Sequence, residues 1–280
     1  MGLDWTILQF LAAPFVASLI LTGIHAYLGV HVVERGVIFV DLSLAQIAAL
    51  GSTMAILLPF TGGDAHGPWV YWTSLVFTFI GAAVFSTIRS RKARIPQEAI
   101  IGIAYAVASG ATILAMSHAT SESEHLKDML VGNILAVSWP EVQKTAALYA
   151  GVGLFHYIFR RQFLTISMSH GKEEVNGLNV KLWDFLFYAS FGFVVTSSVS
   201  IAGVLLVFCY LIVPSVAAML YADRIGTRLA IGWSMGTIVS ALGIYLSVKL
   251  DLPTGAAMVC TFGIVLILMA LVKPLLRRQA

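Results

Sequence analysis

The stretch WDFLFYASFGFVVTSSVSIAGVLLVFCYLIVPSVAAMLYA, residues 183–222, is an almost unbroken apolar run. A transmembrane helix needs about 20 apolar residues to cross the hydrocarbon core of a bilayer. The run is therefore too long for one span. Dividing it at Ser198-Val199-Ser200 predicts two consecutive membrane helices.

The rest of the chain has the same character. Hydrophobic residues make up 59% of the 280, charged residues 11%, and the mean hydropathy is +0.88, whereas soluble domains carry about 25% charged residues. We therefore predict an all-α bundle of eight to nine transmembrane helices forming one domain, 1–280. The N-terminus lacks the basic region of a signal peptide, so the first span is expected to stay as an anchor. The predicted spans are 8–30, 37–59, 69–88, 97–117, 141–159, 183–200, 203–222, 229–248 and 254–272.

Basic residues predict the orientation of these spans. Fourteen of the seventeen fall on alternate loops, and Lys/Arg-rich loops lie on the cytoplasmic side of a membrane. The nine-span arrangement then has its N-terminus outside and its C-terminus in the cytoplasm, which in a bacterium is an inner-membrane topology. The opposite loops hold only Lys127, Lys144 and Lys249.

Small residues predict close helix packing in two spans. Ala45, Ala48, Ala49 and Ser52 follow one another in the second span, and GIAYAVASGA, 102–111, places glycines and alanine at a spacing of four. Small side chains let helices approach closely where lipid supplies no hydrophobic driving force. We therefore expect a tightly packed bundle.

Several function classes have no support in the sequence. There is no G-x-x-x-x-G-K-[ST], H-E-x-x-H or G-x-S-x-G pattern, so we expect neither a nucleotide site nor catalysis, and no cofactor. The net charge of +3 comes from scattered residues and does not predict nucleic-acid binding. Cys209 and Cys260 lie in apolar runs and suit buried small hydrophobes. Any energy for active transport must come from another subunit or an ion gradient.

The segment FVDLSLAQIAALG, 39–51, carries three polar residues in an apolar span. An aspartate at mid-bilayer costs about 2.5–3.5 kcal/mol on insertion scales, and such residues usually mark a pathway. Asp41, Ser43 and Gln46 are therefore candidates to line a route for a cation. The alternative is that Asp41 pairs with Arg35 near the membrane interface.

Histidines and acidic residues supply further candidates. His25 and His31 flank the inner half of the first span. His25 is the deeper of the two, and its neutral imidazole could bind a transition metal or simply make hydrogen bonds. The outer loop HATSESEHLKD, 118–128, could concentrate cations at the outer mouth or be a hydrated acidic loop. Its candidate residues are His118, Glu122, Glu124, His125 and Asp128.

Two segments do not suit a full span. MLVGNILAVSW, 129–139, is apolar but about half a span long, which favours a re-entrant or interfacial element. SHGKEEVNGLNV, 169–180, lies in the longest predicted cytoplasmic loop and is mildly amphipathic, with Gly177 near an expected helix end. A short helix along the cytoplasmic face would suit it.

These residues together resemble a known family, the permeases of zinc/manganese/iron-type metal-ion ABC importers. The resemblance runs over nearly the whole chain and rests on five segments in order. They are GVHVVERGVIFVDLSLAQIAALG (29–51), LVGNILAVSW (130–139), HGKEEVNGLNV (170–180), AGVLLVFCYLIVPSVAAML (202–220) with Pro214, and LDLPTGAAMV (250–259).

The resemblance implies a transport subunit rather than an enzyme. Two copies of the permease would form the pathway, cytoplasmic ABC ATPase subunits would drive it, and an extracytoplasmic metal-binding protein would deliver the ion. Segment 169–180 would couple to the ATPase through Lys172, Glu173, Glu174 and Gly177. The ion, zinc or manganese first and iron next, would cross by alternating access. A stand-alone secondary transporter or channel is the alternative.

The second span departs from the family pattern. Aligned on Arg35-Gly36 and Gly51, Gln46 stands where the family often has a histidine, and the family aspartate position falls on Leu42, one residue after Asp41. Gln is a harder, weaker ligand than His. A metal-binding role at this position therefore does not transfer directly, and His25 could supply a replacement imidazole.

Overall fold

The computed structural model describes residues 5–57, 67–88, 95–116, 134–169, 175 and 177–277. In these ranges the chain is helical apart from connecting turns and an isolated bridge between Val175 and Leu178. The predicted all-α class is confirmed. The helices are α1 (Trp5–Arg35), α2 (Val40–Leu57), α3 (Pro68–Ile88), α4 (Gln97–Met116), the 3₁₀ helix η2 (Ile134–Ala136), α6 (Trp139–Ile158), α7 (Arg160–Met168), α8 (Val180–Tyr221), α9 (Ile225–Leu250) and α10 (Thr254–Arg277).

Seven of the described helices are long and apolar enough to cross a membrane: α1, α2, α3, α4, α8, α9 and α10. Two features explain the difference from the nine predicted spans. One is that α8, at 42 residues, covers two predicted spans. The other is that α6 is 20 residues long but less apolar than the seven spanning helices. The chain is thus a multi-pass membrane protein.

Helix α8 is interrupted at Gly203. This residue has φ 75° and ψ 161°, so two helices meet in a kink there. Backbone with positive φ and ψ near 160° is essentially restricted to glycine. The division of the apolar run is therefore confirmed, but it falls three residues after the polar Ser198-Val199-Ser200 that the sequence suggested.

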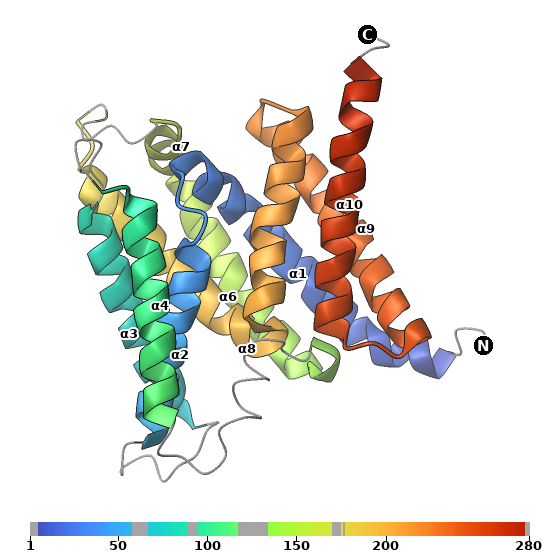
Figure 1. The fold of residues 1–280 in the computed structure, drawn as a ribbon, viewed down its shortest axis with the longest axis horizontal. Coiled ribbons are helices and arrows are strands. Elements are labelled where there is room, and N and C mark those ends of the chain that lie inside the picture. The colour runs from blue at the N-terminus through green and yellow to red at the C-terminus, as the bar shows by residue number, and fades with distance from the viewer. Residues whose placement is uncertain are drawn as a thin grey trace. The chain divides into compact units, whose positions relative to one another are not determined.

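The contacts of the chain divide it into two compact units. The first comprises Met1–Val33, Asp128–Gly153 and Ser198–Ala280, and the second Glu34–Lys127 and Leu154–Ser197. In the second unit α2 packs against both α3 and α4, as Figure 1 shows. The Oγ of Ser74 donates to the Ala48 carbonyl at 2.9 Å across the α2–α3 contact.

In the first unit, α1 contacts α8 and α9 through polar groups as well as apolar ones. Nε1 of Trp233 donates to the Gly23 carbonyl at 3.0 Å, and Oγ of Ser215 lies 3.2 Å from the Ala26 carbonyl. Helix α9 also packs against α10, where a Cβ on Gly243 would lie 2.8 Å from Cγ of Met258. Glycine is required at that close approach.

Small residues fulfil the close-packing prediction in α2 but not in α4. Ala45, Ala48 and Ala49 are buried, and a Cβ on Gly51 would meet Cβ of Phe77 at 2.9 Å. A Cβ on Gly102 or Gly110, by contrast, would have no described atom of a neighbour within 4 Å. The expectation of close packing at 102–111 is wrong for the described chain, because that face of α4 meets no neighbour there.

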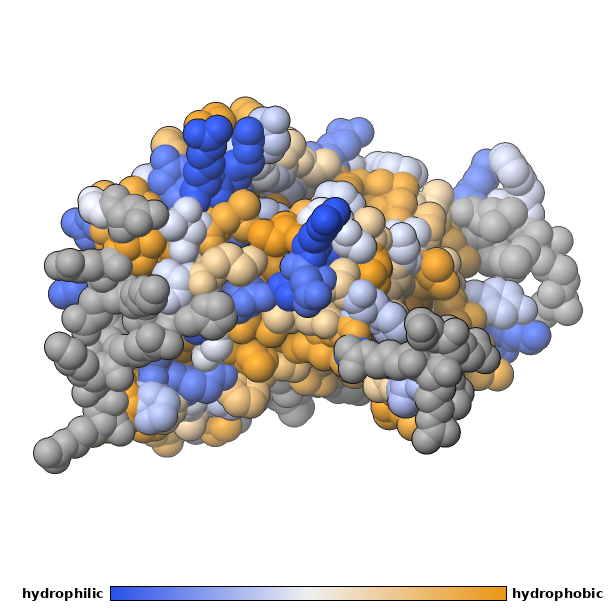
Figure 2. Space-filling model, turned by 90° about the horizontal axis from the view of Figure 1, so that it is seen from above, coloured by the Kyte–Doolittle hydropathy of each residue, from blue (hydrophilic) through white to orange (hydrophobic). Residues whose placement is uncertain are grey.

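Large hydrophobic side chains also cover much of the outside. Val107, Leu114, Ile238 and Leu271 are each more than 60% exposed. Figure 2 shows apolar residues over much of the visible surface, with hydrophilic residues in separate groups. Exposed apolar area on this scale requires an apolar surrounding, which agrees with burial in lipid.

The amphipathic helix α7 directly precedes the predicted coupling segment 169–180 along the chain. α7 ends at Met168 with Phe163, Ile166 and Ser167 buried. Among the described residues of 169–180, the Leu178 N–H donates to the Val175 carbonyl at 2.8 Å, and Gly177 has φ 71°. A positive φ takes the backbone out of helix, so the chain turns at 177–179. Residues 170–174 and 176, where the short helix is predicted, lie outside the described residues.

The start of α6 explains why 129–139 does not continue as a span. Glu141 accepts hydrogen bonds from both the backbone N–H and the hydroxyl of Ser138, at 2.8 and 2.7 Å. This is an arrangement typical of a helix N-terminus. The described part of 129–139 holds only the short η2 before this cap, in agreement with an element shorter than a span.

Candidate functional site

Asp41 lies in the first turn of α2 and is only 1% exposed. Its Oδ1 makes no hydrogen bond with any described residue. The N-terminus of a helix carries partial positive charge, which favours a carboxylate at this position. A second carboxylate reaches the same helix end, because Glu98 of α4 accepts a hydrogen bond from the Phe39 N–H at 2.9 Å. The Oδ1 atom of Asp41 is therefore a buried carboxylate oxygen that can still accept a hydrogen bond or bind a cation.

Ser43 and Gln46 follow on the same helix and are both buried, with Ser43 fully inaccessible. Like Asp41, Ser43 has a side-chain oxygen, Oγ, without a hydrogen bond to the described chain. Because successive residues are 100° apart around a helix, Ser43 and Gln46 share one face. Carboxylate, hydroxyl and amide oxygens are hard ligands that suit ions such as Mn²⁺.

The pairing of Asp41 with Arg35 that the sequence left open is not formed. The Nη1 of Arg35 instead lies 2.5 Å from Oδ1 of Asp184, and its Nε donates to Oγ of Ser167 at 2.9 Å. The side chains of Arg35 and Asp184 are 2% and 0% exposed. A salt bridge to Arg35 therefore does not explain the burial of Asp41.

His25 has contacts at both ring nitrogens. Its Nδ1 lies 2.8 Å from the Leu21 carbonyl oxygen, and its Nε2 lies 3.1 Å from Oγ of Ser198. Ser198 in turn contacts the Tyr149 hydroxyl at 2.5 Å. This geometry favours the hydrogen-bonded interpretation of His25, because neither nitrogen is left to bind a metal while these contacts hold.

Some predicted positions lie outside the described residues. These are His118, Glu122, Glu124, His125 and Asp128 of the outer loop, and Lys172, Glu173 and Glu174 of the coupling segment. Within the ranges that the structure does describe, no three His, Cys, Asp or Glu side chains come together as a metal site. A tightly held resident metal therefore has no donor set in those ranges.

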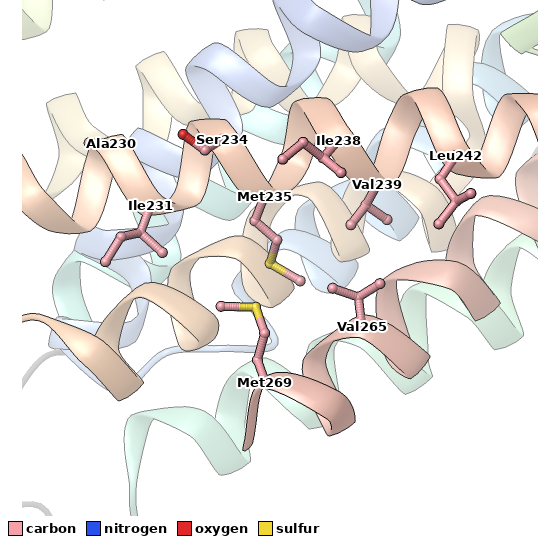
Figure 3. A pocket seen from close by; sticks show the side chains of 9 residues that line it. All are labelled: Ala230, Ile231, Ser234, Met235, Ile238, Val239, Leu242, Val265 and Met269. Carbon is pink, nitrogen blue, oxygen red and sulfur yellow. The ribbon is translucent and has the colours of Figure 1, made fainter. Parts of the chain in front are cut away.

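A groove of about 440 Å³ runs along α9 and α10, as Figure 3 shows. Ser234 is the one polar side chain among its lining residues, and the thioethers of Met235 and Met269 point toward one another. Such a lining offers no carboxylate or carbonyl side chain of the kind that hard cations prefer. The groove is not a candidate for binding a divalent cation.

Two further acidic side chains with partners in the structure are not among the site residues predicted from the sequence. Asp184 stands inside the apolar run 183–222 and Glu98 at the start of a predicted span. Both could have been flagged by the rule that identified Asp41, since a carboxylate in an apolar segment needs a partner or a function. Their partners, 149 and 59 residues away, could not be read from one sequence.

The long apolar helices define a multi-pass membrane protein. The family model of the ABC 3 transport family matches residues 7–273, and the chain belongs to that family. The manganese transport system membrane protein MntC of Listeria monocytogenes is 29% identical over 203 residues, 70% of this chain and 72% of the relative. The manganese import system permease protein ScaB of Streptococcus parasanguinis is 21% identical over 273 residues, 97% of this chain and 93% of the relative.

A solved structure shares the fold. PsaBC from Streptococcus pneumoniae, in complex with Fab, superposes with a TM-score of 0.77 at 22% identity. The superposition covers 96% of this chain and 92% of that one. The family expected from the five sequence segments is confirmed by the family match.

Proposed function

We propose that this chain is the membrane-spanning permease of an ATP-driven importer for a divalent transition-metal ion. The observation that carries the proposal is the buried carboxylate of Asp41, whose Oδ1 lacks a partner in the described chain. The chain's membership of the ABC 3 transport family supports the same proposal. Relatives named for manganese import make manganese the first cargo to test, with zinc and iron as the comparison ions.

The proposed pathway is lined by Asp41, Ser43 and Gln46. Ser43 and Gln46 share one face of α2, whereas Asp41 lies about 140° from Gln46 around the helix, so the ion would meet these oxygen ligands in succession along the route. Weak binding suits a pathway, because an ion that is held tightly leaves slowly. His25 stands outside this set, since both of its nitrogens have hydrogen-bonding neighbours.

The proposed assembly contains two copies of this chain, two cytoplasmic ABC ATPase subunits and an extracytoplasmic metal-binding protein. The N-terminus lies outside and the C-terminus in the cytoplasm, as the basic loops predict. Segment 169–180 docks on the ATPase, and ATP binding and hydrolysis there open the dimer to one side at a time. The chain itself carries out no bond chemistry. The outer loop 118–128 concentrates cations at the entrance.

Reconstitution tests the transport proposal. The chain and its ATPase are placed in liposomes, and uptake of radioactive manganese is followed with ATP, without ATP and without the ATPase. Uptake that needs both ATP and the ATPase is expected. Uptake that persists without the ATPase would support a stand-alone transporter or channel instead.

Docking is tested by charge reversal at Lys172, Glu173 and Glu174. Loss of ATPase co-purification is expected, whereas reversal of Lys249, which the charge pattern places on the opposite side, leaves it intact. An ATPase that still co-purifies with the first variant and hydrolyses ATP normally would argue against docking at this segment.

A further inference from the structure

Arg35 is the last residue of α1, and its side chain is held at three points. Nη1 lies 2.5 Å from Oδ1 of Asp184, and Nε lies 2.9 Å from Oγ of Ser167. Its Cζ sits 3.9 Å from the centroid of the Phe187 ring. A planar guanidinium with contacts in its plane and above its face is fixed in both position and orientation.

The partners of Arg35 belong to the two helices on either side of the proposed docking segment. Ser167 is on α7 and Asp184 on α8. Those two helices are joined by an apolar cluster containing Ile166, Val175 and Val180, with Leu178 and Trp183 packed against it. The end of α7, Val175, the turn at 177–179 and the start of α8 therefore form one packed body. A displacement of that body must move Arg35 or break its contacts.

On its other side, Arg35 is joined to the start of α2 by a short, well-defined turn. Gly36 has φ 69°, Val37 is buried, and the Val40 N–H donates to the Val37 carbonyl at 3.1 Å. Asp41 follows directly. Movement of Arg35 is thus transmitted through a few constrained residues to the buried carboxylate of the proposed pathway.

A buried ion pair is weak evidence for a role in stability. Taking two charges out of water is costly, and replacing a buried pair by packed hydrophobic side chains is often neutral or stabilising. What a buried charge pair adds is a single defined geometry between the elements that it joins. A contact with one defined geometry suits two structural elements that must move together.

We propose that the Arg35–Asp184 pair is the positioning link through which the α7–α8 body moves the start of α2. The pair transfers motion from the ATPase docking segment to Asp41, so that ATP hydrolysis is converted into ion movement. This inference rests on the proposed function. Arg35 and Asp184 are positioning residues, and neither needs to contact the ion.

The test uses the permease–ATPase complex in liposomes and measures manganese transported per ATP hydrolysed. The double variant Arg35→Met with Asp184→Leu removes both charges and so leaves no unpaired buried charge. We expect ATPase co-purification and hydrolysis to persist while the transported ion per ATP falls about tenfold, within the usual range for coupling between two sites. The control is Thr78→Val with Thr196→Val, which removes a buried hydroxyl contact between α3 and α8 and should leave the ratio unchanged.

The single variant Arg35→Lys provides an independent measurement should the double variant fail to assemble. It keeps the charge but loses the fork that contacts Asp184 and Ser167 together, and it should also lower the ratio. If either assembled variant transports as much manganese per ATP as the wild type, the proposed link is wrong. The same holds if transport and ATP hydrolysis fall in parallel. A wild-type complex that moves no metal at all would instead refute the proposed function.

Discussion

The hydroxyl of Ser198 donates to Nε2 of His25. The direction follows from the other ring nitrogen: Nδ1 lies 2.8 Å from the Leu21 carbonyl, which can only accept, so Nδ1 carries the hydrogen. Nε2 is then an acceptor facing Ser198 at 3.1 Å. The tautomer of His25 is thereby set by its own helix, and its lone pair is engaged within a buried polar chain that continues to Tyr149.

Replacing His25 by Leu should destabilise the protein without changing its affinity for metal. The change removes the hydrogen bond between His25 and the Ser198 hydroxyl, and losing a hydrogen bond of this kind costs about 0.5–1.5 kcal/mol. Thermal unfolding in detergent should shift down, while the manganese KM of the folded transporter stays the same. Tyr149→Phe is the matched control and should cost about 1 kcal/mol. A His25 variant with normal stability and lost uptake would return the imidazole to the pathway.

Asp41→Asn should reduce manganese uptake while membrane abundance is unchanged. The amide has the same shape but loses the charge that attracts the ion, and we expect a fall of about tenfold or more, equivalent to about 1.4 kcal/mol. Asp251→Asn is the control, because Asp251 is exposed and left-handed, with φ 53°, a conformation that asparagine tolerates. Normal uptake by the Asp41 variant would assign the segment to packing.

Gln46 should influence which metal crosses. Gln46→Ala removes the amide oxygen that we propose contacts the ion and should lower the uptake of manganese and zinc alike. Gln46→His supplies an imidazole, which suits zinc better than an amide does, and should raise zinc uptake relative to manganese. Competition between the two ions in the reconstituted system measures the ratio. An unchanged ratio in the histidine variant would place Gln46 beside the route and out of contact with the ion.

Gly51 and Gly102 should respond oppositely to alanine. At Gly51 the added methyl would lie 2.9 Å from Cα of Ser74, and such overpacking costs about 1–3 kcal/mol. At Gly102 the position is open toward the described chain, so alanine should be neutral or stabilise α4 by up to about 1 kcal/mol. Unfolding in a graded denaturant series compares the two. Equal stability of both variants would contradict the α2–α3 packing.

Gly203→Ala should destabilise the kink in α8. Alanine at φ 75° and ψ 161° costs about 1–3 kcal/mol, and the strain favours a continuous helix in that region. Thermal unfolding of this variant is compared with that of Gly263→Ala, a glycine in α10 with open space around it among the described residues. An unchanged unfolding temperature for Gly203→Ala alone would show that the kink does not depend on glycine.

The positions of most spans could be predicted because bilayer thickness fixes the length of an apolar helix. The prediction 97–117 matches α4 (Gln97–Met116), and 69–88 matches α3 (Pro68–Ile88). The sequence predicts that the long apolar run breaks at the polar Ser198-Val199-Ser200. The backbone instead breaks at Gly203, because glycine can adopt the positive φ that the kink requires. α7 was missed because it is short, although the spacing of Phe163, Ile166 and Ser167 indicates a helix with one buried face.

The candidate site was less accessible to prediction. Hydropathy alone identified Asp41 as a buried carboxylate in need of a reason. The sequence also suggested Arg35 as its partner, because the two residues are close along the chain. The structure assigns Arg35 to Asp184, 149 residues away. Long-range pairing depends on how helices pack, and one sequence contains no direct record of that packing.

The kink in α8 also bears on how the chain is made. Ala202 and Val204 on either side of Gly203 are almost fully buried, so no hydrophilic connector separates the two halves of this helix. During synthesis, a hydrophilic loop between two spans lets the first settle in the membrane before the second arrives. The two halves of α8 have no such loop between them. We therefore expect them to enter the lipid together as a single insertion unit.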